Sequence, residues 1–470
     1  MNSEKKDKCG VFGVWGPQDS AHLAYTALYA QQHRGQESAG IAVTDGHRLQ
    51  AHVGMGLVSE VFTGETLVRL HGHAAIGHNR YSTTGSSMAC NAQPLLAEYV
   101  GGQVALGHNG NLINAQLLRH DYERRGHIFN TSTDTEVIIH LLAAHHLSKA
   151  DPLAEALHHL QGAYSLVFLF HDRLEAARDP WGWRPLVLGR TPSSHWCVAS
   201  ETVALDALGA TFVREVEPGE IVTLDKNGVS SRRFADTRTP AHCIFEHVYF
   251  ANPSSMIFGD TVQIVRERLG EKLAEESPVD ADCVIPMPDS GRSAALGFSR
   301  ASGLPFREGI VPNRYVGRTF IQPTQEQRNL AVQLKLNVVS EVVRGKRIVV
   351  VDDSIVRGTT TRGKMEQLRR AGTREIHMRV SCPPIRHACY FGIDFPDPSK
   401  LIANQRSVEE IRDFLGVDSL HFLSMEGMLN CVSLPADHYC TACYSGVYRL
   451  NIEKPVTKLD LERNQLKMFT

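Results

Sequence analysis

Two adjacent acids follow an apolar run in the second half of the chain. Residues 348–351 (IVVV) predict a buried strand, and Asp352 and Asp353 come directly after it. Ligands of a parallel sheet bind beyond the carboxyl ends of its strands, so carboxylates at this position suit sugar hydroxyls or a divalent cation. A strand exit with two solvated acids is the alternative.

The segment after these acids has the composition of an anion-binding turn. Residues 354–361 (SIVRGTTT) carry hydroxyl side chains and Gly358 ahead of an expected helix. Backbone N–H groups at the start of a helix attract anions, and a glycine lets an anion approach the backbone closely. The segment therefore suits a monophosphate, and a capped helix without a ligand is the alternative.

A cysteine near the start of the chain is a candidate nucleophile. Cys9 follows a charged tail of eight residues and precedes the apolar segment GVFG. Release of nitrogen from an amide needs a nucleophile, a base and an oxyanion hole. A cysteine can use its own α-amine as the base only when it is the first residue, so residues 1–8 would have to be removed. An inert thiol in the core is the alternative.

These residues fall in two stretches of different character. From Cys9 to about residue 234, short strands with glycine-rich turns alternate with helices, which predicts an α+β layered domain. From about residue 241, a strand–loop–helix order occurs twice and returns to a strand, which predicts a parallel sheet. We expect a linker at 236–240 and a helix at 262–275. In the first half we expect strands at 9–15, 39–43, 49–53, 74–80, 104–109 and 165–170, and helices at 21–32, 114–125 and 134–144.

The composition excludes several classes of protein. The chain has 470 residues and a net charge of -2, so it has no global basic field for nucleic acid. Its longest apolar run, near 164–170, is too short to span a bilayer, and residues 1–8 lack the apolar core of a secretory signal. We therefore expect a cytoplasmic protein of roughly two to four domains that binds neither nucleic acid nor membranes.

The cysteines allow buried thiols, a nucleophile or metal ligands. Without a secretory signal, disulfides are not expected. The pair Cys440 and Cys443 has the spacing of a metal clip, and two buried thiols explain that spacing equally well. The ten cysteines are Cys9, Cys90, Cys197, Cys243, Cys283, Cys382, Cys389, Cys431, Cys440 and Cys443.

Several motifs of the first half resemble the N-terminal-nucleophile glutamine amidotransferase domain, an αββα sandwich. In the family's order they are CGVFG (9–13), HRGQESAG (33–40), GHNRYSTTG (77–85), GHNGNL (107–112), STDTE (132–136) and ASET (199–202). The resemblance implies that Cys9 is the nucleophile. It further implies that Arg80 binds the α-carboxylate of glutamine and Asp134 its α-ammonium. Asn109 and the N–H of Gly110 would form the oxyanion hole.

The second half resembles phosphoribosyltransferases through VVVDDSIVRGTT (349–360). The resemblance implies that Asp352 and Asp353 contact the ribose hydroxyls of phosphoribosyl pyrophosphate (PRPP) and one Mg²⁺, with Ser290 near the metal. The 5-phosphate would be held by Ser354, Arg357, Gly358, Thr359 and Thr360.

The segment 313–337 would close over PRPP. Its Arg318 and Lys335 could hold the leaving pyrophosphate. A solvated basic surface is the alternative interpretation of this segment.

Together the two halves resemble one family, the glutamine PRPP amidotransferases, from residue 9 to about 448. The resemblance implies conversion of PRPP, glutamine and water to 5-phosphoribosylamine, glutamate and pyrophosphate, the first committed step of purine synthesis, with ammonia passed internally. It also implies inhibition by purine nucleotides such as AMP and GMP, and a homotetramer. The implied division is a propeptide (1–8), an amidotransferase domain (9–235) and a phosphoribosyltransferase domain with a C-terminal iron–sulfur and helical region (241–470).

The tail before Cys9 resembles the propeptide of the iron–sulfur subclass of this family. That resemblance implies one [4Fe–4S] cluster per subunit. Cys382 remains a competing ligand, because it lies close to Cys389 in the sequence. The implied ligands are Cys243, Cys389, Cys440 and Cys443.

Two other functions remain open from the sequence. A different N-terminal-nucleophile amidotransferase would share the first half but lack the motif at 349–360. A PRPP-sensing regulator of purine genes would lack the glutaminase motifs and would need a basic recognition element, which the sequence does not show.

Overall fold

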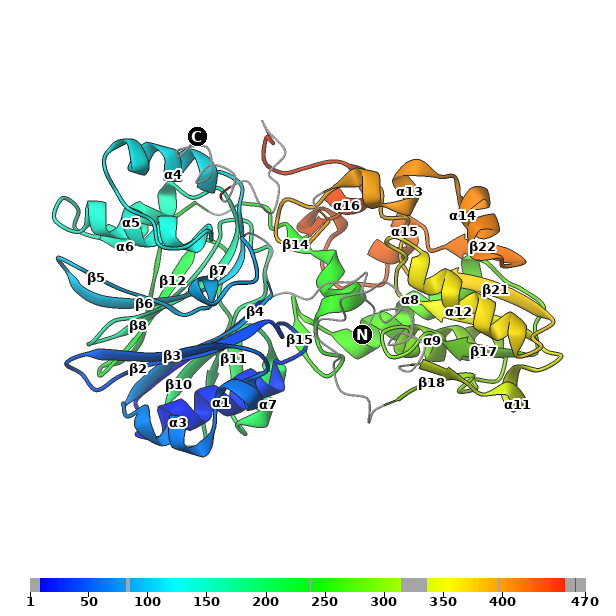
Figure 1. Cartoon of the computed structure of the whole chain (residues 1–470), viewed down its shortest axis with the longest axis horizontal. Coiled ribbons are helices and arrows are strands. Elements are labelled where there is room, and N and C mark those ends of the chain that lie inside the picture. Colours follow the sequence, from blue (N-terminus) through cyan, green and yellow to red (C-terminus); the bar gives the residue numbers. More distant parts are fainter. Residues whose placement is uncertain are drawn as a thin grey trace.

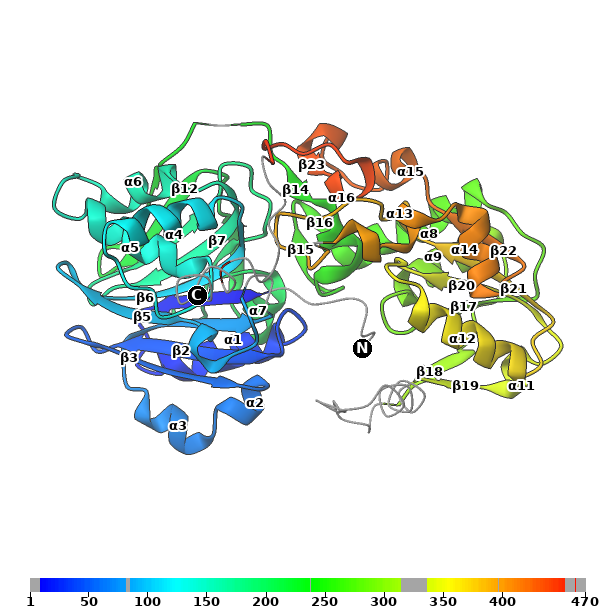
Figure 2. The same cartoon turned by 45° about the horizontal axis from the view of Figure 1, so that its top comes forward.

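The computed structural model describes residues 9–81, 85–236, 238–313, 336–395, 397–452 and 461. In Figure 1 the chain forms two bodies side by side, the first half on the left and the second half on the right. The turned view in Figure 2 shows the same arrangement, with β14 (His242–Cys243) between the two bodies. The expected propeptide, Arg318 and Lys335 lie outside the described residues.

The first half contains two antiparallel sheets, ordered β11-β9-β10-β1-β4-β2-β3 and β13-β12-β8-β7-β6-β5. The first comprises β1 (Gly10–Trp15), β2 (Ser38–Thr44), β3 (Leu49–Met55), β4 (Ala74–Arg80), β9 (Val187–Arg190), β10 (Trp196–Ala199) and β11 (Thr211–Glu215). The second comprises β5 (Leu95–Tyr99), β6 (Gly102–Leu112), β7 (Gly162–Leu169), β8 (Leu174–Arg178), β12 (Glu220–Asp225) and β13 (Gly228–Arg233).

The two sheets stack face to face between two layers of helices (Figure 1). The outer face of the first sheet packs against α1 (Ser20–Ala30), α2 (Val58–Val61), α3 (Gly64–Arg69) and α7 (Thr202–Ala207). The second sheet packs against α4 (Ala115–Arg124), α5 (Thr135–His145) and α6 (Pro152–His158). This αββα sandwich confirms the fold class expected for the first half.

The sequence of β1 shows why the layers form. Phe12 and Val14 enter the core beneath the helices, whereas Val11 enters the core between the sheets, as the two-residue period of a strand requires. Gly13 lies on the same side as Val11, and a Cβ there would come within 2.7 Å of Leu174 on β8. The glycine therefore lets the two sheets approach each other.

All six strands expected in the first half are present, with ends moved by a few residues, and the three expected helices correspond to α1, α4 and α5. The expected strands do not include β5 and β8 to β13. Each of these strands has only four to six residues, so its periodicity is a weak signal, whereas the equally short β1 is continuously buried and directly follows Cys9.

The second half is built on a parallel sheet, ordered β17-β20-β21-β22. Its strands are β17 (Cys283–Pro286), β20 (Arg347–Asp352), β21 (Glu375–Val380) and β22 (Ser419–Phe422). The longer helices of this half are α8 (Val262–Glu276), α9 (Arg292–Ser302), α12 (Thr359–Arg370) and α14 (Val408–Leu415). The expected α/β fold and the helix expected at 262–275 are confirmed.

Short elements complete the second half. They are β15 (Met256–Ile257), β16 (Asp260–Thr261), β18 (Ile310–Pro312), β19 (Leu336–Val338), β23 (Tyr439–Cys440), α11 (Ser340–Val343), α13 (Ile402–Gln405), α15 (Met425–Leu429), α16 (Ala442–Ser445), a π-helical turn, Glu246–Phe250, and two 3₁₀ helices, Pro398–Lys400 and Ala436–His438.

β13 ends at Arg233 and β14 begins at His242, so the expected linker falls between these strands, and the domain limits stay a prediction. None of the described helices combines the length and the hydropathy that crossing a membrane requires.

Candidate active sites

Cys9 lies in a small pocket of the first half. It directly precedes β1, its residue is 7% exposed, and its Sγ donates a hydrogen bond to the carbonyl oxygen of Tyr81 at 3.5 Å. Most residues expected to act on glutamine line the same pocket, although they come from separate strands and from the start of α5. The lining residues are Cys9, Arg80, Tyr81, Gln93, His108, Gly110, Thr133, Asp134 and Thr135.

Burial determines the charge of the Cys9 thiol. Burial raises the pKa of Cys9 to about 11, although the backbone of Tyr81 and the charge of Arg80 act in the opposite direction. The thiol is therefore protonated near neutral pH. Because the thiolate is the reactive form, catalysis at Cys9 needs a base. This need agrees with the expected use of a freed α-amine.

Two opposite charges lie in the pocket with Cys9. Arg80 ends β4 and is buried, and Asp134 precedes α5 with its Oδ2 accepting the N–H of Leu112 at 2.9 Å. Burial alone would raise the pKa of Asp134, but His108, the Leu112 N–H and Arg80 together hold that pKa below its ordinary value. A guanidinium and a carboxylate in one pocket complement the carboxylate and ammonium of a free amino acid.

Asn109 and Gly110 are consecutive residues of β6. The Nδ2 atom of Asn109 donates to the Oγ of Ser200 at 3.5 Å, and Gly110 lines the pocket. A Cβ at Gly110 would overlap the carbonyl oxygen of Ala163 on β7, so the position requires glycine. Of the two donors expected for the oxyanion hole, Gly110 lines the pocket of Cys9, whereas Asn109 is not among the residues that line it.

Gly110→Ala is expected to lower glutamine hydrolysis on the order of a hundredfold, because the added methyl group would push the N–H of Gly110 away from its position. Glutamate release at saturating glutamine measures the effect, with thermal unfolding recorded in parallel. Gly64→Ala in α3 is the matched control, because its Cβ would meet no atom within 4 Å. A Gly110→Ala protein as fast as the parent would contradict the assignment.

Ser200 is a site residue to which the sequence assigned no role. Its Oγ accepts the N–H of Val11 at 2.9 Å and the Nδ2 of Asn109 at 3.5 Å, so it connects the strand of the nucleophile to the expected oxyanion hole. Ser200 belongs to the ASET motif, and this membership is the feature of the sequence that could have indicated a role in the site. Its partners lie about 90 and 190 residues away, so spacing could not reveal the contact.

The two acids of the second half lie at the carboxyl end of β20, as expected. Asp352 and Asp353 are almost fully buried, and the Asp352 Oδ1 accepts the N–H of Asp353 at 2.9 Å. The Oγ of Ser354 donates to Asp353 at 2.6 Å. Gly358 then takes a left-handed conformation with φ +78° and caps the first turn of α12. The two carboxylates therefore lie next to the start of α12. This arrangement suits a sugar phosphate, whose hydroxyls would meet the carboxylates and whose phosphate would meet the N–H groups of the helix.

The loop that contains Ser290 lies against this strand end. The N–H of Met287 donates to the carbonyl of Val351 at 2.8 Å, and a Cβ at Gly291 would lie 3.1 Å from the Cα of Asp352. Parallel pairing of β17 with β20 brings the two loops to the same edge of the sheet. Arg357, Thr359 and Thr360 follow in the turn and at the start of α12.

The four cysteines implied as cluster ligands are brought together from three segments. Cys243 and Cys440 are paired in the parallel strands β14 and β23, and Cys443 follows in α16. Burial raises the pKa of Cys389 to about 11 and that of Cys440 to about 12, and the Cys243 thiol adds to both shifts. Cys382 also acts on the pKa of Cys443, so a fifth buried thiol adjoins the group.

Four buried thiols are a donor set that fits an iron–sulfur cluster. In the described part of the chain, no three His, Cys, Asp or Glu side chains are arranged to hold a single metal ion. In a four-iron cluster each of the four thiolates binds a different iron, so the four sulfur atoms need not surround a single metal position. The donor chemistry of these four cysteines therefore fits an iron–sulfur cluster.

A buried cysteine shares a pocket with a guanidinium and a carboxylate in the first half, and two adjacent acids end a parallel strand in the second half. These two sites together are the arrangement expected of an amidotransferase with two catalytic halves. Residues 78–207 match the family model described as "Glutamine amidotransferase domain". The chain is 49% identical to the chloroplastic amidophosphoribosyltransferase of Glycine max, over 96% of this chain and 80% of that protein. It is 47% identical to the amidophosphoribosyltransferase of Methanothermobacter thermautotrophicus, over 98% of both chains.

Solved structures agree over the same length. One described as "structure of the allosteric regulatory enzyme of purine biosynthesis" superposes with a TM-score of 0.90 at 45% identity, covering 96% of this chain and 98% of the other. The glutamine PRPP amidotransferase from B. subtilis complexed with ADP and GMP superposes with a TM-score of 0.89 at 44% identity. That match covers 96% of this chain and 99% of the other. The chain belongs to the amidophosphoribosyltransferase family. These full-length matches disfavour both alternatives left open by the sequence.

Proposed function

We propose that this protein converts PRPP, glutamine and water to 5-phosphoribosylamine, glutamate and pyrophosphate, the first committed step of purine synthesis. The observation that carries the proposal is the pocket that Cys9 shares with Arg80 and Asp134, in a chain that also has Asp352 and Asp353 at a strand end. The identity of 47–50% to curated amidophosphoribosyltransferases over nearly the whole chain supports it.

The first half-reaction takes place at Cys9. After removal of residues 1–8, the freed α-amine accepts the thiol proton and Sγ attacks the amide carbon of glutamine. Asn109 and the N–H of Gly110 stabilise the negative oxygen of the tetrahedral intermediate. The α-ammonium returns the thiol proton to the leaving nitrogen as the intermediate collapses, which releases ammonia and leaves a thioester at Sγ. Water then hydrolyses the thioester to glutamate and free thiol.

The second half-reaction takes place at the end of β20. Asp352 and Asp353 hold the ribose hydroxyls, while the turn 354–360 holds the 5-phosphate. Asp352 and Asp353, near Ser290, would hold one Mg²⁺ ion, whose positive charge would favour the departure of pyrophosphate. Ammonia forms the new bond to the anomeric carbon as the bond to pyrophosphate breaks.

Contacts between the two halves support direct transfer of ammonia. The Nδ2 atom of Asn111 donates to the carbonyl of Tyr390 at 2.9 Å. A Cβ at Gly392 would lie 3.2 Å from the carbonyl carbon of Gly110. The second half thus packs directly behind the strand that carries the oxyanion hole, and a closed path would protect both ammonia and the labile product from solvent.

The decisive experiment measures glutamate and pyrophosphate in parallel, with and without PRPP and Mg²⁺. The proposal expects glutamate release that is weak alone, rises with PRPP, and equals pyrophosphate release one for one. Glutamate release that ignores PRPP would indicate a different acceptor. Absence of release from protein whose mass shows that it begins at Cys9 would refute the glutaminase assignment.

We also propose that Cys243, Cys389, Cys440 and Cys443 hold one [4Fe–4S] cluster of structural role, which places the chain in the propeptide-bearing iron–sulfur subclass. Anaerobically purified protein is expected to be brown, to contain iron and sulfide, and to lose thermal stability when oxygen bleaches it. Cys440→Ser is expected to lose the colour, and Cys90→Ser, at an exposed thiol, to keep it. A colourless, iron-free and fully active preparation would refute the cluster.

Regulation by purine nucleotides such as AMP and GMP belongs to the same proposal. The B. subtilis relative was solved with ADP and GMP, which supports nucleotide binding in this family. We extend the proposal to a homotetramer and to one Mg²⁺ per subunit. Inhibition curves with each nucleotide and the mass of the protein in solution test these points.

A further inference from the structure

Arg34 is a fully buried guanidinium that contacts the nucleophile residue through the main chain. Its Nε donates to the carbonyl oxygen of Cys9 at 3.0 Å. Its other two nitrogens bind acids: Nη2 lies 3.0 Å from Oε1 of Glu246, and Nη1 lies 3.1 Å from Oε2. Nη1 also binds Glu201. Arg34 therefore uses every nitrogen of its planar group, which fixes its orientation.

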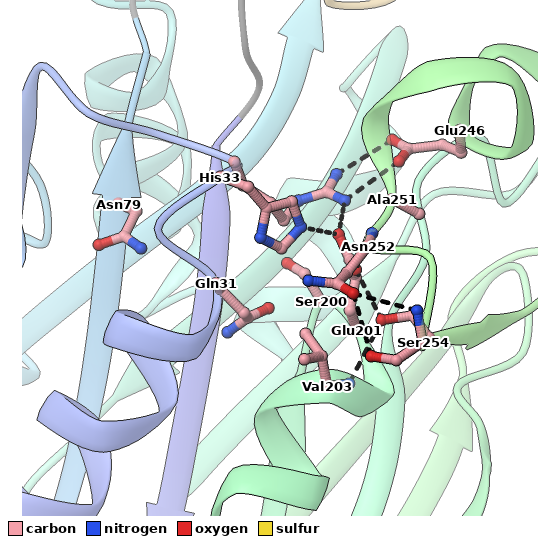
Figure 3. Close-up of polar contacts among 12 residues, drawn as sticks. Gln31, His33, Asn79, Ser200, Glu201, Val203, Glu246, Ala251, Asn252 and Ser254 are labelled. Atoms are coloured by element: carbon pink, nitrogen blue, oxygen red, sulfur yellow. Dashed lines mark hydrogen bonds and ion pairs between the residues drawn. The ribbon is translucent and has the colours of Figure 1, made fainter. Parts of the chain in front are cut away.

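Glu246 comes from the other half of the chain. It begins the π-helical turn Glu246–Phe250, which follows β14 and lies beyond the residues expected to form the amidotransferase domain. Figure 3 shows its carboxylate reaching the guanidinium beside His33, and Glu201 joined to the backbone of Asn252. Glu246 is fully buried and also binds Arg184 at 3.1 Å, so its charge is balanced by two guanidiniums.

The same turn is held on its other side near the acids of the PRPP site. Arg266 of α8 donates to the carbonyl oxygens of His247 and Ala251 at 2.7 and 2.9 Å. Burial lowers the pKa of Arg266 to about 10, and the nearby charge of Asp353 acts in the opposite direction. The turn that carries Glu246 is therefore held by Arg34 on the side of Cys9 and by Arg266 on the side of Asp353.

We propose that Glu246 is a positioning residue of the glutaminase site, acting through Arg34 on the main chain of Cys9, so that the second half of the chain completes a site in the first. The inference rests on the proposed role of Cys9 as nucleophile. Removing one buried acid leaves Arg34 undercompensated, and the guanidinium then shifts toward Glu201. The Cys9 carbonyl follows it, and a displacement of about 1 Å at a nucleophile can cost about a hundredfold in rate.

Glu246→Gln tests this role, because it removes the charge while keeping shape and one acceptor oxygen. The kcat of glutamine hydrolysis is expected to fall about 10- to 100-fold, with the KM for glutamine nearly unchanged because Arg80 and Asp134 are untouched. Synthesis from added ammonium chloride is expected to stay within about twofold, since it bypasses Cys9. Arg34→Lys is expected to lower glutamine hydrolysis while it keeps the ammonia-dependent synthesis, because one ammonium group cannot make all the hydrogen bonds of the planar guanidinium.

Glu220→Gln is the matched control. Glu220 is also a buried carboxylate, and it binds the guanidinium of Arg214 at 2.6 and 2.8 Å, but it lies on β12 away from the Cys9 pocket. It is expected to keep both activities. If Glu246→Gln does not fold, Glu246→Asp, which keeps the charge and shortens the reach, is measured in the same way.

Two results would overturn the positioning role. One is a glutaminase rate in Glu246→Gln equal to that of the parent. The other is an equal fall in the glutamine- and ammonia-dependent rates, which would indicate general structural damage. A Cys9→Ala protein that still released glutamate would instead refute the proposed nucleophile, so the two failures are distinguishable.

Discussion

Cys9→Ala is expected to lose glutamine-dependent synthesis by on the order of a thousandfold or more while it keeps synthesis from ammonium chloride. Among the described residues that line the pocket, Cys9 is the one that carries a thiol, so no neighbour can take over the attack on the amide. The proposed ribose site at the end of β20 keeps all its residues. Phosphoribosylamine formation is measured with each nitrogen source at saturating PRPP.

Cys197→Ala is the matched control for this prediction. Cys197 is a buried thiol on β10, and it pairs with Val14 of β1, the strand that directly follows Cys9. It packs in the core beneath the helices and is expected to keep both activities with a modest loss of thermal stability. Loss of the ammonia-dependent reaction in Cys9→Ala would show that the two sites are not separable as proposed.

Asp353→Asn is expected to lower synthesis from either nitrogen source by about a hundredfold or more. Its carboxylate accepts the hydroxyl of Ser354 and adjoins Asp352 at the strand end. An amide is uncharged and offers only one acceptor oxygen, so it binds a divalent cation and two ribose hydroxyls poorly. Initial rates over a range of PRPP and Mg²⁺ concentrations measure the loss.

Asp280→Asn is the control for the second prediction. Asp280 is an exposed acid that pairs with Arg347 at the opposite end of β20, where the strand begins. An exposed ion pair contributes little, so this variant is expected to match the parent in rate and nearly in stability. A normal synthetic rate in Asp353→Asn would show that PRPP binds elsewhere.

The local sequence was sufficient to predict the main elements and to propose the two reaction centres. The alternation of Val11, Phe12 and Val14 fixes which face of β1 enters which core, because a strand turns successive side chains to opposite sides. The run that ends at Asp352 could be recognised because a buried parallel strand is continuously apolar. Motif order was sufficient to predict both catalytic halves and the family.

The tertiary structure alone decided how these parts are held. The Ser200 bridge to β1 and the contact of Arg34 with Glu246 join residues about 190 and 210 positions apart. No periodicity or spacing encodes such a pair, because the partners meet only after the sheets stack and the halves dock. Burial then makes these contacts obligatory, since a charged side chain removed from water must find its opposite charge within the fold.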